Sequence, residues 1–298
     1  FYIYYSMFGF QRVGDLAWAA GDSQTRGFLL GATAGRTTLN GEGLQHQDGH
    51  SHVQAGLIPN CVTYDPTYGY EIAVVVREGL RRMYEENENV FFYLTLMNEN
   101  YQHPAMPEDK AVEEQIIKGI YQLEQVAPAK GKIIANVQLM GSGTILEKVR
   151  EAAQILANDY SISSDVYSVT SFNQLGRDGQ DVTRWNMLHP ESKPRVPYIN
   201  TVITKDAGPA IAATDYIKNY SDQVRAYIDT EYRCLGTDGF GRSDSRANLR
   251  THFEVNAAYV VVASLFELAN RGDIERSVVT EAIKRFAIDT EKLNPLYA

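Results

Sequence analysis

One short stretch of the sequence concentrates the side chains that could do chemistry. Residues 41–52 read Gly-Glu-Gly-Leu-Gln-His-Gln-Asp-Gly-His-Ser-His, and they hold three of the six histidines in the chain together with Glu42 and Asp48. Histidines titrate near neutral pH and can donate a hydrogen bond, accept one or bind a metal ion. Dense glycines let a backbone turn sharply and approach a ligand closely. A polar loop of this kind between ordered segments is a good candidate for a functional site.

Three interpretations of this stretch are open from its residues. On a strand, His50 and His52 would point to the same side, and His46 and Asp48 could add metal ligands. The helical zinc spacing His-Glu-x-x-His is absent and no cysteine lies nearby, so we expect a catalytic or substrate-contacting loop and no metal site. The same composition is equally typical of a solvated turn whose histidines cluster by chance.

Length and charge limit the class of protein. The 298 residues are enough for one large domain or two ordinary ones, and 44% hydrophobic with 22% charged residues predicts a globular, core-forming chain. The net charge of −9 argues against nucleic acid or an anionic membrane as the main partner.

The cysteines and the apolar runs indicate where the protein works. Cys61 and Cys234 are far apart and neither belongs to a Cys-x-x-Cys pair, so we expect a reducing compartment, the cytoplasm, and no structural zinc. No apolar run reaches membrane-spanning length and no signal peptide is visible. The chain opens on an aromatic run, Phe1 to Tyr5, without a methionine. That start predicts a buried strand and a fragment of a longer polypeptide.

Alternating patterns in the first third predict an α/β unit. Aromatic and β-branched runs favour strands, and apolar residues at helical spacing favour helices. Ser6 is placed to cap the first helix. The predicted elements are a strand at 1–5, a helix after it, a strand at 27–32, a strand-like run from about Ala55, a strand at 60–66, a helix at 70–85 and a buried strand at 90–97.

A strand that runs directly into a helix places the residues of the junction at the carboxyl edge of the sheet, where open α/β sheets bind ligands. Here those residues are Tyr5 and Phe8. Core packing is the alternative interpretation for both aromatic side chains.

The region from 104 to 132 is polar, contains three prolines and predicts a domain boundary, with a short helix or strand at 113–125. A second α/β unit follows it. Its predicted elements are strands at 135–140, 165–169 and 209–214 and helices at 145–158, 216–227, from about Asp244, at 252–268 and at 274–286, with 184–190 unassigned.

The loop Gly141-Ser142-Gly143 stands between a predicted strand and a predicted helix, an arrangement that phosphate-binding loops share. It lacks the third glycine, the lysine and an acid placed for a ribose. We therefore interpret its glycines as allowing a sharp turn and close packing.

Four motifs together resemble a known family. They are residues 5–12, 40–46, 48–52 and 236–246, and they are similar to the homodimeric bacterial type of pyruvate dehydrogenase E1 component. The resemblance runs from Phe1 to Ala298 and matches the C-terminal third of that enzyme. It implies an α/β fold of two units: a thiamine diphosphate (pyrimidine)-binding domain at 1–107 and a transketolase C-terminal-like domain at 108–298.

The resemblance also implies a function. Members of the family use thiamine diphosphate and Mg²⁺, decarboxylate pyruvate, and pass the acetyl unit to a lipoyl group on the E2 dihydrolipoyl acetyltransferase. They are homodimers with the cofactor at the dimer interface. By the resemblance, Phe8 packs against the aminopyrimidine ring, and Tyr5 and His46 donate hydrogen bonds to oxygens of the substrate-derived adduct. Glu42 lines the same channel, and no family role falls on His50 or His52.

Two family features have no match in these residues: the glutamate that activates the aminopyrimidine, and the Gly-Asp-Gly metal motif. Asp178-Gly179 and Asp238-Gly239 lack the first glycine of that motif. The resemblance places both features upstream of Phe1, so we expect half an active site here, no magnesium ligands, and a structural role for the C-terminal domain. The alternatives are another transketolase-like or 2-oxo-acid dehydrogenase E1 enzyme, or a non-catalytic dimerisation or E2-assembly module.

Overall fold

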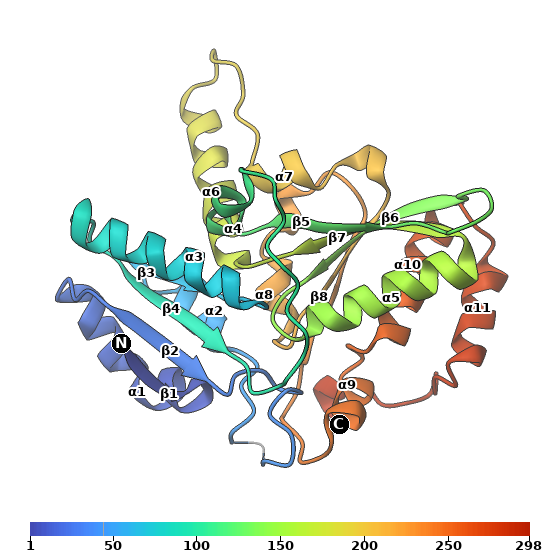
Figure 1. The fold of residues 1–298 in the computed structure, drawn as a ribbon, viewed down its shortest axis with the longest axis horizontal. Helices are drawn as coiled ribbons and strands as arrows, with labels where there is room; N and C mark the ends of the chain where they lie inside the picture. The colour runs from blue at the N-terminus through green and yellow to red at the C-terminus, as the bar shows by residue number, and fades with distance from the viewer. Residues whose placement is uncertain (44) are drawn as a thin grey trace.

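The computed structural model describes residues 1–43 and 45–298, and it contains two α/β units, each built on its own sheet (Figure 1). Leu44, within the histidine-rich stretch, lies outside the described residues. The prediction of two α/β units is confirmed. No helix in the described ranges is long and apolar enough to cross a membrane.

The first unit has a parallel four-stranded sheet in the order β1-β2-β4-β3. Helices α1 and α2 pack on one face, in a core cluster that contains Phe10 of α1, Ala55 of α2 and Tyr93 of the strand β4. Helices α3 and α4 cover the other face. The elements are β1 (Tyr2–Tyr5), α1 (Ser6–Asp22), β2 (Phe28–Ala32), α2 (Ser51–Gly56), β3 (Cys61–Tyr64), α3 (Gly69–Leu80) with a π-helical turn η1 (Arg81–Glu85), β4 (Phe91–Leu96) and α4 (Val112–Lys118).

The first strand is exposed, and the prediction of a buried strand at 1–5 is wrong. β1 lies at the edge of the sheet and pairs only with β2, so Tyr2 and Ile3 are more than 60% exposed. Aromatic and β-branched residues report a preference for a pleated surface, and they do not report whether another layer covers it.

Two further local predictions are corrected. Helix α1 begins at Ser6 with no side-chain cap, and the Ser6 hydroxyl is buried without a partner. The strand-like run expected from Ala55 is the end of helix α2, and the strand begins only at Cys61.

The second unit has a five-stranded sheet in the order β5-β7-β6-β8-β9, parallel except for β5, which runs antiparallel to β7. Helices α5, α10 and α11 pack on one face and α6, α7 and α8 on the other. The strands are β5 (Tyr121–Val126), β6 (Ala135–Gly141), β7 (Ile162–Ser168), β8 (Ala210–Ala213) and β9 (Tyr232–Leu235). The helices are α5 (Ile145–Tyr160), α6 (Phe172–Leu188), α7 (Tyr198–Val202), α8 (Lys218–Asp222), α9 (Arg246–His252), α10 (Ala257–Arg271) and α11 (Arg276–Arg285), with 3₁₀ turns at Lys205–Ala207, Arg225–Tyr227 and Pro295–Tyr297.

Several helices of this unit differ from the prediction. The unassigned residues 184–190 contain the end of α6, whose 17 residues were not recognised as a helix. The helix expected at 216–227 is the short α8 followed by a 3₁₀ turn. The helix expected from about Asp244 is α9, which ends at His252, and the helix expected at 252–268 is α10, which starts only at Ala257. The 104–132 region contains both a helix, α4, and a strand, β5.

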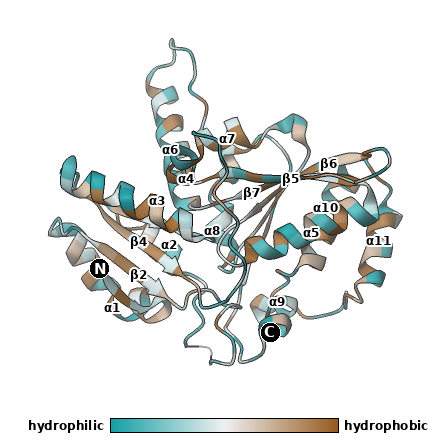
Figure 2. Ribbon diagram, in the orientation of Figure 1, coloured by the Kyte–Doolittle hydropathy of each residue, from teal (hydrophilic) through white to brown (hydrophobic). Residues whose placement is uncertain are grey.

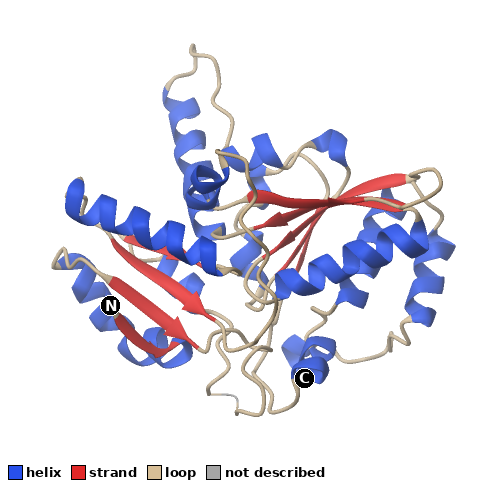
Figure 3. Cartoon of the chain, in the orientation of Figure 1, coloured by secondary structure: helices blue, strands red, loops and turns tan. Residues whose placement is uncertain are grey.

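The parallel strands of the two sheets direct their carboxyl ends toward a shared region in the middle of the molecule, and the antiparallel β5 runs the other way (Figures 1 and 3). Apolar residues line the strands and the helix faces that cover them (Figure 2). Asp65, after β3, donates its backbone N–H to the Thr170 carbonyl, after β7, at 2.8 Å. The loops at these strand ends therefore come from both units and lie beside one another.

Candidate active site

The aromatic residues predicted for the site meet at the carboxyl end of β1. Tyr5 ends that strand, opposite Ala32 at the end of β2, and Phe8 lies in the first turn of α1. The ring of His46, from the loop after β2, stacks on Tyr5 at 5.7 Å between centroids and meets the Phe8 ring edge-on at 4.8 Å. The ring centroids of Tyr5 and Phe8 are 5.9 Å apart. Segments more than 35 residues apart thus form one cluster.

Glu42 completes this group, which we call the edge cluster (Tyr5, Phe8, Glu42 and His46). Its carboxylate oxygen Oε2 lies 2.6 Å from Nδ1 of His46. The contact holds the imidazole in one orientation and leaves Nε2 as the ring nitrogen that can reach another molecule. The Glu42 side chain is about half exposed and the Tyr5 side chain is 50% exposed, so the edge cluster opens to solvent.

Two residues of α1 that the sequence did not single out support the cluster. The guanidinium of Arg12 lies 4.1 Å from the centroid of the Phe8 ring, within the range of a cation–π contact. The side chain of Gln11 lies 2.6 Å from Nε2 of His50 and ties the helix to the histidine loop. The helical spacing of Phe8 and Arg12, four residues, could have indicated the first contact. No local pattern indicates the second.

His50 and His52 are not on a strand, so the strand-based metal arrangement is wrong. His50 immediately precedes α2 and His52 lies within it. His52 is fully buried, stacks on Tyr220 at 4.8 Å, and lies with Nε2 2.9 Å from the Thr95 hydroxyl. Burial lowers its pKa to about 3, so it stays neutral. It belongs to the packing between the units.

Asp48 serves the start of α2. Its Oδ1 accepts hydrogen bonds from the backbone N–H groups of His50 and Ser51, at 3.0 and 2.9 Å. This pattern satisfies N–H groups that a helix start leaves free. Among the described residues, no three His, Cys, Asp or Glu side chains are grouped so that they could hold a metal ion.

The loop Gly141-Ser142-Gly143 packs tightly, as interpreted from its residues. A Cβ on Gly141 would lie 2.7 Å from Cα of Leu146, and Gly143 has a φ of +50°. The Ser142 hydroxyl donates to the Asp65 carboxylate at 2.7 Å. The glycines let strand and helix approach each other, and the loop joins the two units.

Buried polar side chains join the two units at a region that we call the junction (His52, Asp65 and Asp215). Asp65 Oδ1 accepts from the Thr95 hydroxyl at 2.6 Å and from the Tyr216 hydroxyl at 3.1 Å. Burial raises the pKa of Asp65 to about 7, against these hydrogen bonds, which lower it. The junction therefore contains a carboxyl group that titrates near neutral pH.

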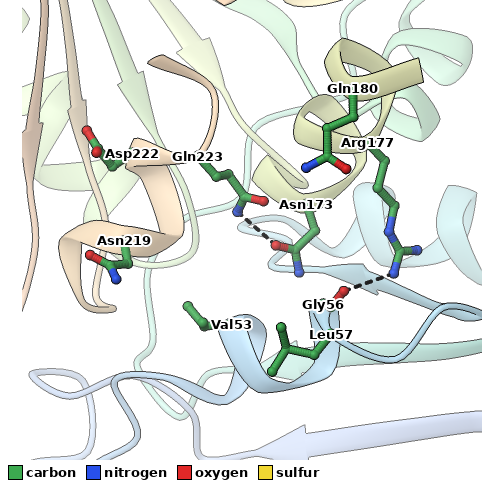
Figure 4. A pocket seen from close by; sticks show the side chains of 9 residues that line it. All are labelled: Val53, Gly56, Leu57, Asn173, Arg177, Gln180, Asn219, Asp222 and Gln223. Carbon is green, nitrogen blue, oxygen red and sulfur yellow. Dashed lines mark hydrogen bonds between the residues drawn. The ribbon is translucent and has the colours of Figure 1, made fainter. Parts of the chain in front are cut away.

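A separate hollow of about 470 Å³ lies where α2, α6 and α8 meet (Figure 4). Amide side chains dominate its wall, and Gln223 donates to Asn173 across it at 2.8 Å. Arg177 donates to the Gly56 carbonyl at 3.2 Å. None of the edge-cluster residues lines this hollow.

Two family models match the chain. Residues 1–104 match the pyruvate dehydrogenase E1 component middle domain, and residues 119–256 match the transketolase-like TK C-terminal domain. These matches fall on the first and second α/β units.

Relatives that align with the whole length of this chain share one name. The chain is 65% identical over its full length to the pyruvate dehydrogenase E1 component of Escherichia coli strain K12 and 58% identical to that of Haemophilus influenzae. It is 61% identical, over 99% of its length, to the protein of the same name from Pseudomonas aeruginosa. In each case it covers 33% of the relative, so the chain spans about a third of the length of the curated relatives it matches.

Solved structures with the same fold include transketolases. One from Campylobacter jejuni matches 88% of this chain with a TM-score of 0.64 at 16% identity, over 35% of its own length. One from Leishmania mexicana matches 90% of this chain with a TM-score of 0.64 at 17% identity, over 34% of its own length. At these identities the likeness shows the fold alone, and it confirms the predicted transketolase-like α/β architecture.

Proposed function

We propose that this chain is the part of a pyruvate dehydrogenase E1 enzyme that contacts the aminopyrimidine of thiamine diphosphate and the substrate. The proposal starts from the homology of the whole chain to a third of the pyruvate dehydrogenase E1 component. The reaction is the oxidative decarboxylation of pyruvate, with transfer of the acetyl unit to the lipoyl group of E2. The observation that carries this proposal is the edge cluster. Side chains that the family resemblance assigns to cofactor and substrate meet at one sheet edge.

The edge cluster suits a flat, partly cationic ring. Phe8 and Tyr5 present aromatic surface at the end of a parallel strand, and aromatic rings bind such heterocycles by stacking and by contact with their faces. We assign the cofactor contact to Phe8 and Tyr5. Bound thiamine diphosphate supplies an electron sink for the carbon that loses carbon dioxide.

The polar groups of the cluster are assigned to the substrate. The Tyr5 hydroxyl and the His46 imidazole donate hydrogen bonds to oxygens derived from pyruvate, and Glu42 holds His46 in orientation through the 2.6 Å contact. Donors that are already aimed at developing charge stabilise a transition state more than a free substrate. Tyr5, His46 and Glu42 are therefore the catalytic residues of the proposal.

The rest of the enzyme is assigned to sequence beyond these 298 residues. We propose that the two thirds of the relatives' length not spanned here hold the diphosphate, Mg²⁺ and the glutamate that activates the aminopyrimidine. We also propose a cytoplasmic homodimer that delivers acetyl groups to E2, with the cofactor-binding domain at 1–107 and the transketolase C-terminal-like domain at 108–298.

Calorimetry tests the half-site. Thiamine diphosphate with Mg²⁺ is titrated into this chain alone and into a fusion protein that joins the first two thirds of the Escherichia coli relative to this chain. We expect no binding to the chain alone and Mg²⁺-dependent binding to the fusion protein. Tight Mg²⁺-dependent binding to the chain alone would overturn the half-site. Cofactor binding without pyruvate turnover in the fusion protein, where the intact relative is active, would refute the reaction.

A further inference from the structure

A three-residue segment of the second unit holds both ends of the loop that carries Glu42 and His46. The segment is Asp215 to Ile217, which begins two residues after the last residue of β8. The Asp215 carbonyl accepts a hydrogen bond from the Arg36 N–H at 3.1 Å, on the incoming side of the loop. The Ile217 N–H donates to the Gly49 carbonyl at 2.7 Å, on the outgoing side. Two backbone contacts only two residues apart thus fix the separation of the two ends of the loop.

The Asp215 carboxylate makes the strongest set of contacts. It is fully buried, and its Oδ1 accepts from the Thr37 N–H at 2.9 Å and from the Thr37 hydroxyl at 2.7 Å. Its Oδ2 accepts from the Thr38 N–H at 3.0 Å and from the Thr38 hydroxyl at 2.6 Å. Four donors from two successive residues leave the incoming backbone one orientation. Hydrogen bonds of this kind are electrostatically stronger in a buried site than in water.

The approach of the loop to Asp215 requires a glycine. Gly35 has a φ of +88°, and a Cβ there would lie 2.3 Å from Oδ2 of Asp215. Any other residue would push the loop away from the carboxylate or strain the backbone.

A second set of hydrogen bonds closes the base of the loop. The Gln47 side chain donates to the Leu39 carbonyl at 2.8 Å and accepts from the Arg242 N–H at 2.6 Å. The Gly41 N–H donates to the Asp244 carbonyl at 3.0 Å. Residues 39–43 and 45–47 therefore form an arch that contacts the second unit through Gly41 and Gln47. Figure 1 shows this loop beside the loop that precedes α9, at the bottom of the view.

We propose that Asp215 is a positioning residue: through Thr37 and Thr38 it sets the place of the arch that presents Glu42 and His46 to the substrate. The second α/β unit then takes part in the reaction through this contact, beyond the structural role expected for it. The inference rests on the proposed function for its catalytic consequence, and on the hydrogen bonds alone for its effect on the arch.

The matched control is Asp65, which is also fully buried and also joins the two units. Its carboxylate accepts from Thr95, Ser142 and Tyr216, and none of these belongs to the arch. Asp215→Asn and Asp65→Asn keep the volume of the side chain and change the same group. A general loss of stability affects both variants, and a displaced arch affects only Asp215→Asn.

The first measurement is amide hydrogen exchange in the 298-residue chain. We expect Asp215→Asn to speed exchange within the arch, at residues 39–43 and 45–47, and to leave the β6 and β7 strands protected, whereas Asp65→Asn leaves the arch as it is. Equal exchange of the arch in the two variants would overturn the proposal. If Asp215→Asn does not fold, Thr37→Val and Thr95→Val form a milder pair, since each removes one hydroxyl donor from one of the two carboxylates.

The second measurement is steady-state kinetics in the fusion protein. A displaced arch should lower kcat about 10- to 100-fold in Asp215→Asn. The dissociation constant of thiamine diphosphate should not change, because Phe8 lies on α1 and not on the arch. Asp65→Asn should keep its kcat. Equal kcat values for the two variants would remove the catalytic consequence. An inactive fusion protein with Asp215 intact would count against the proposed function, while hydrogen exchange would still decide whether Asp215 holds the arch.

Discussion

The edge cluster and the junction use similar side chains in opposite surroundings. In the edge cluster, Glu42 and His46 contact each other at 2.6 Å and stay partly exposed. In the junction, Asp65 and His52 are fully buried and contacted by groups from both units. The edge cluster has polar groups available to another molecule, whereas the junction uses its polar groups within the fold.

Residue type alone does not identify a catalytic group. A histidine and an acid lie close together in both regions. Burial and hydrogen-bond partners decide whether such a pair can act on a ligand or only hold the structure. Substitutions of His52 and Asp65 should therefore change stability, and substitutions in the edge cluster should change chemistry. Three predictions test this division.

The largest effect is expected from pH at the junction. Asp65 has an ordinary pKa of 3.8 and a pKa of about 7 in the folded protein, so the folded state binds this proton more tightly than the unfolded chain. Its contribution to stability is then greatest below pH 4 and is lost as the pH rises to 7, a change on the order of 4 kcal/mol. Asp65→Asn should remove this part of the slope. Urea unfolding of both proteins between pH 4 and 8 measures it.

The control for this prediction is Asp22→Asn, at an exposed residue, which should keep the slope of the unchanged protein. Parallel stability curves for Asp65→Asn and the unchanged protein would contradict the assignment of a titrating group to the junction.

At the edge cluster, catalysis should fall while stability holds. Tyr5→Phe and His46→Ala in the fusion protein each remove a donor aimed at the substrate, and each should lower pyruvate turnover by about 10- to 1000-fold. Urea unfolding of the chain should change little, because both side chains are partly exposed. Tyr2→Phe, an exposed tyrosine on the same strand, is the matched control and should keep full turnover. Unchanged turnover in both variants would end the catalytic assignment.

The smallest effect is expected at Phe8. Phe8→Ala removes an aromatic contact worth about 1 kcal/mol, so the dissociation constant of thiamine diphosphate in the fusion protein should rise roughly 2- to 10-fold. Phe266→Ala, at a partly exposed phenylalanine on α10, should leave it unchanged. If the constant for Phe8→Ala matches the unchanged protein, Phe8 is a packing residue and belongs with the junction in this comparison.

Local patterns predicted the elements with a simple periodicity. The apolar run at 90–97 is the interior strand β4, and the helix expected at 145–158 is α5. Helix α6 was missed because two of its buried positions are glycines. Gly176 and Gly179 face Gln223 and Tyr227 so closely that a Cβ would lie 2.9 and 2.3 Å from their side chains. Glycines required by close packing resemble glycines that break a helix.

The residues of the edge cluster could be selected from their types and positions, and the family resemblance added their roles. The contacts with the second unit that hold them could not be predicted. Tyr5 and Phe8 are three residues apart in sequence, so their meeting at a sheet edge follows from a strand that leads into a helix. The contact of Asp215 with Thr37 spans 178 residues, and it depends on how two separate sheets face each other. No periodicity within either unit encodes that orientation.

The Asp215 contact limits how these two units can be inherited or exchanged. A gene fusion that replaced the second unit with a distant homologue would keep every residue of the edge cluster, but it would supply a different partner for Gly35, Thr37 and Thr38. The modules can therefore recombine only if both sides of the hydrogen-bonded seam travel together. Evolution of the arch is constrained by a carboxylate encoded in the other half of the chain.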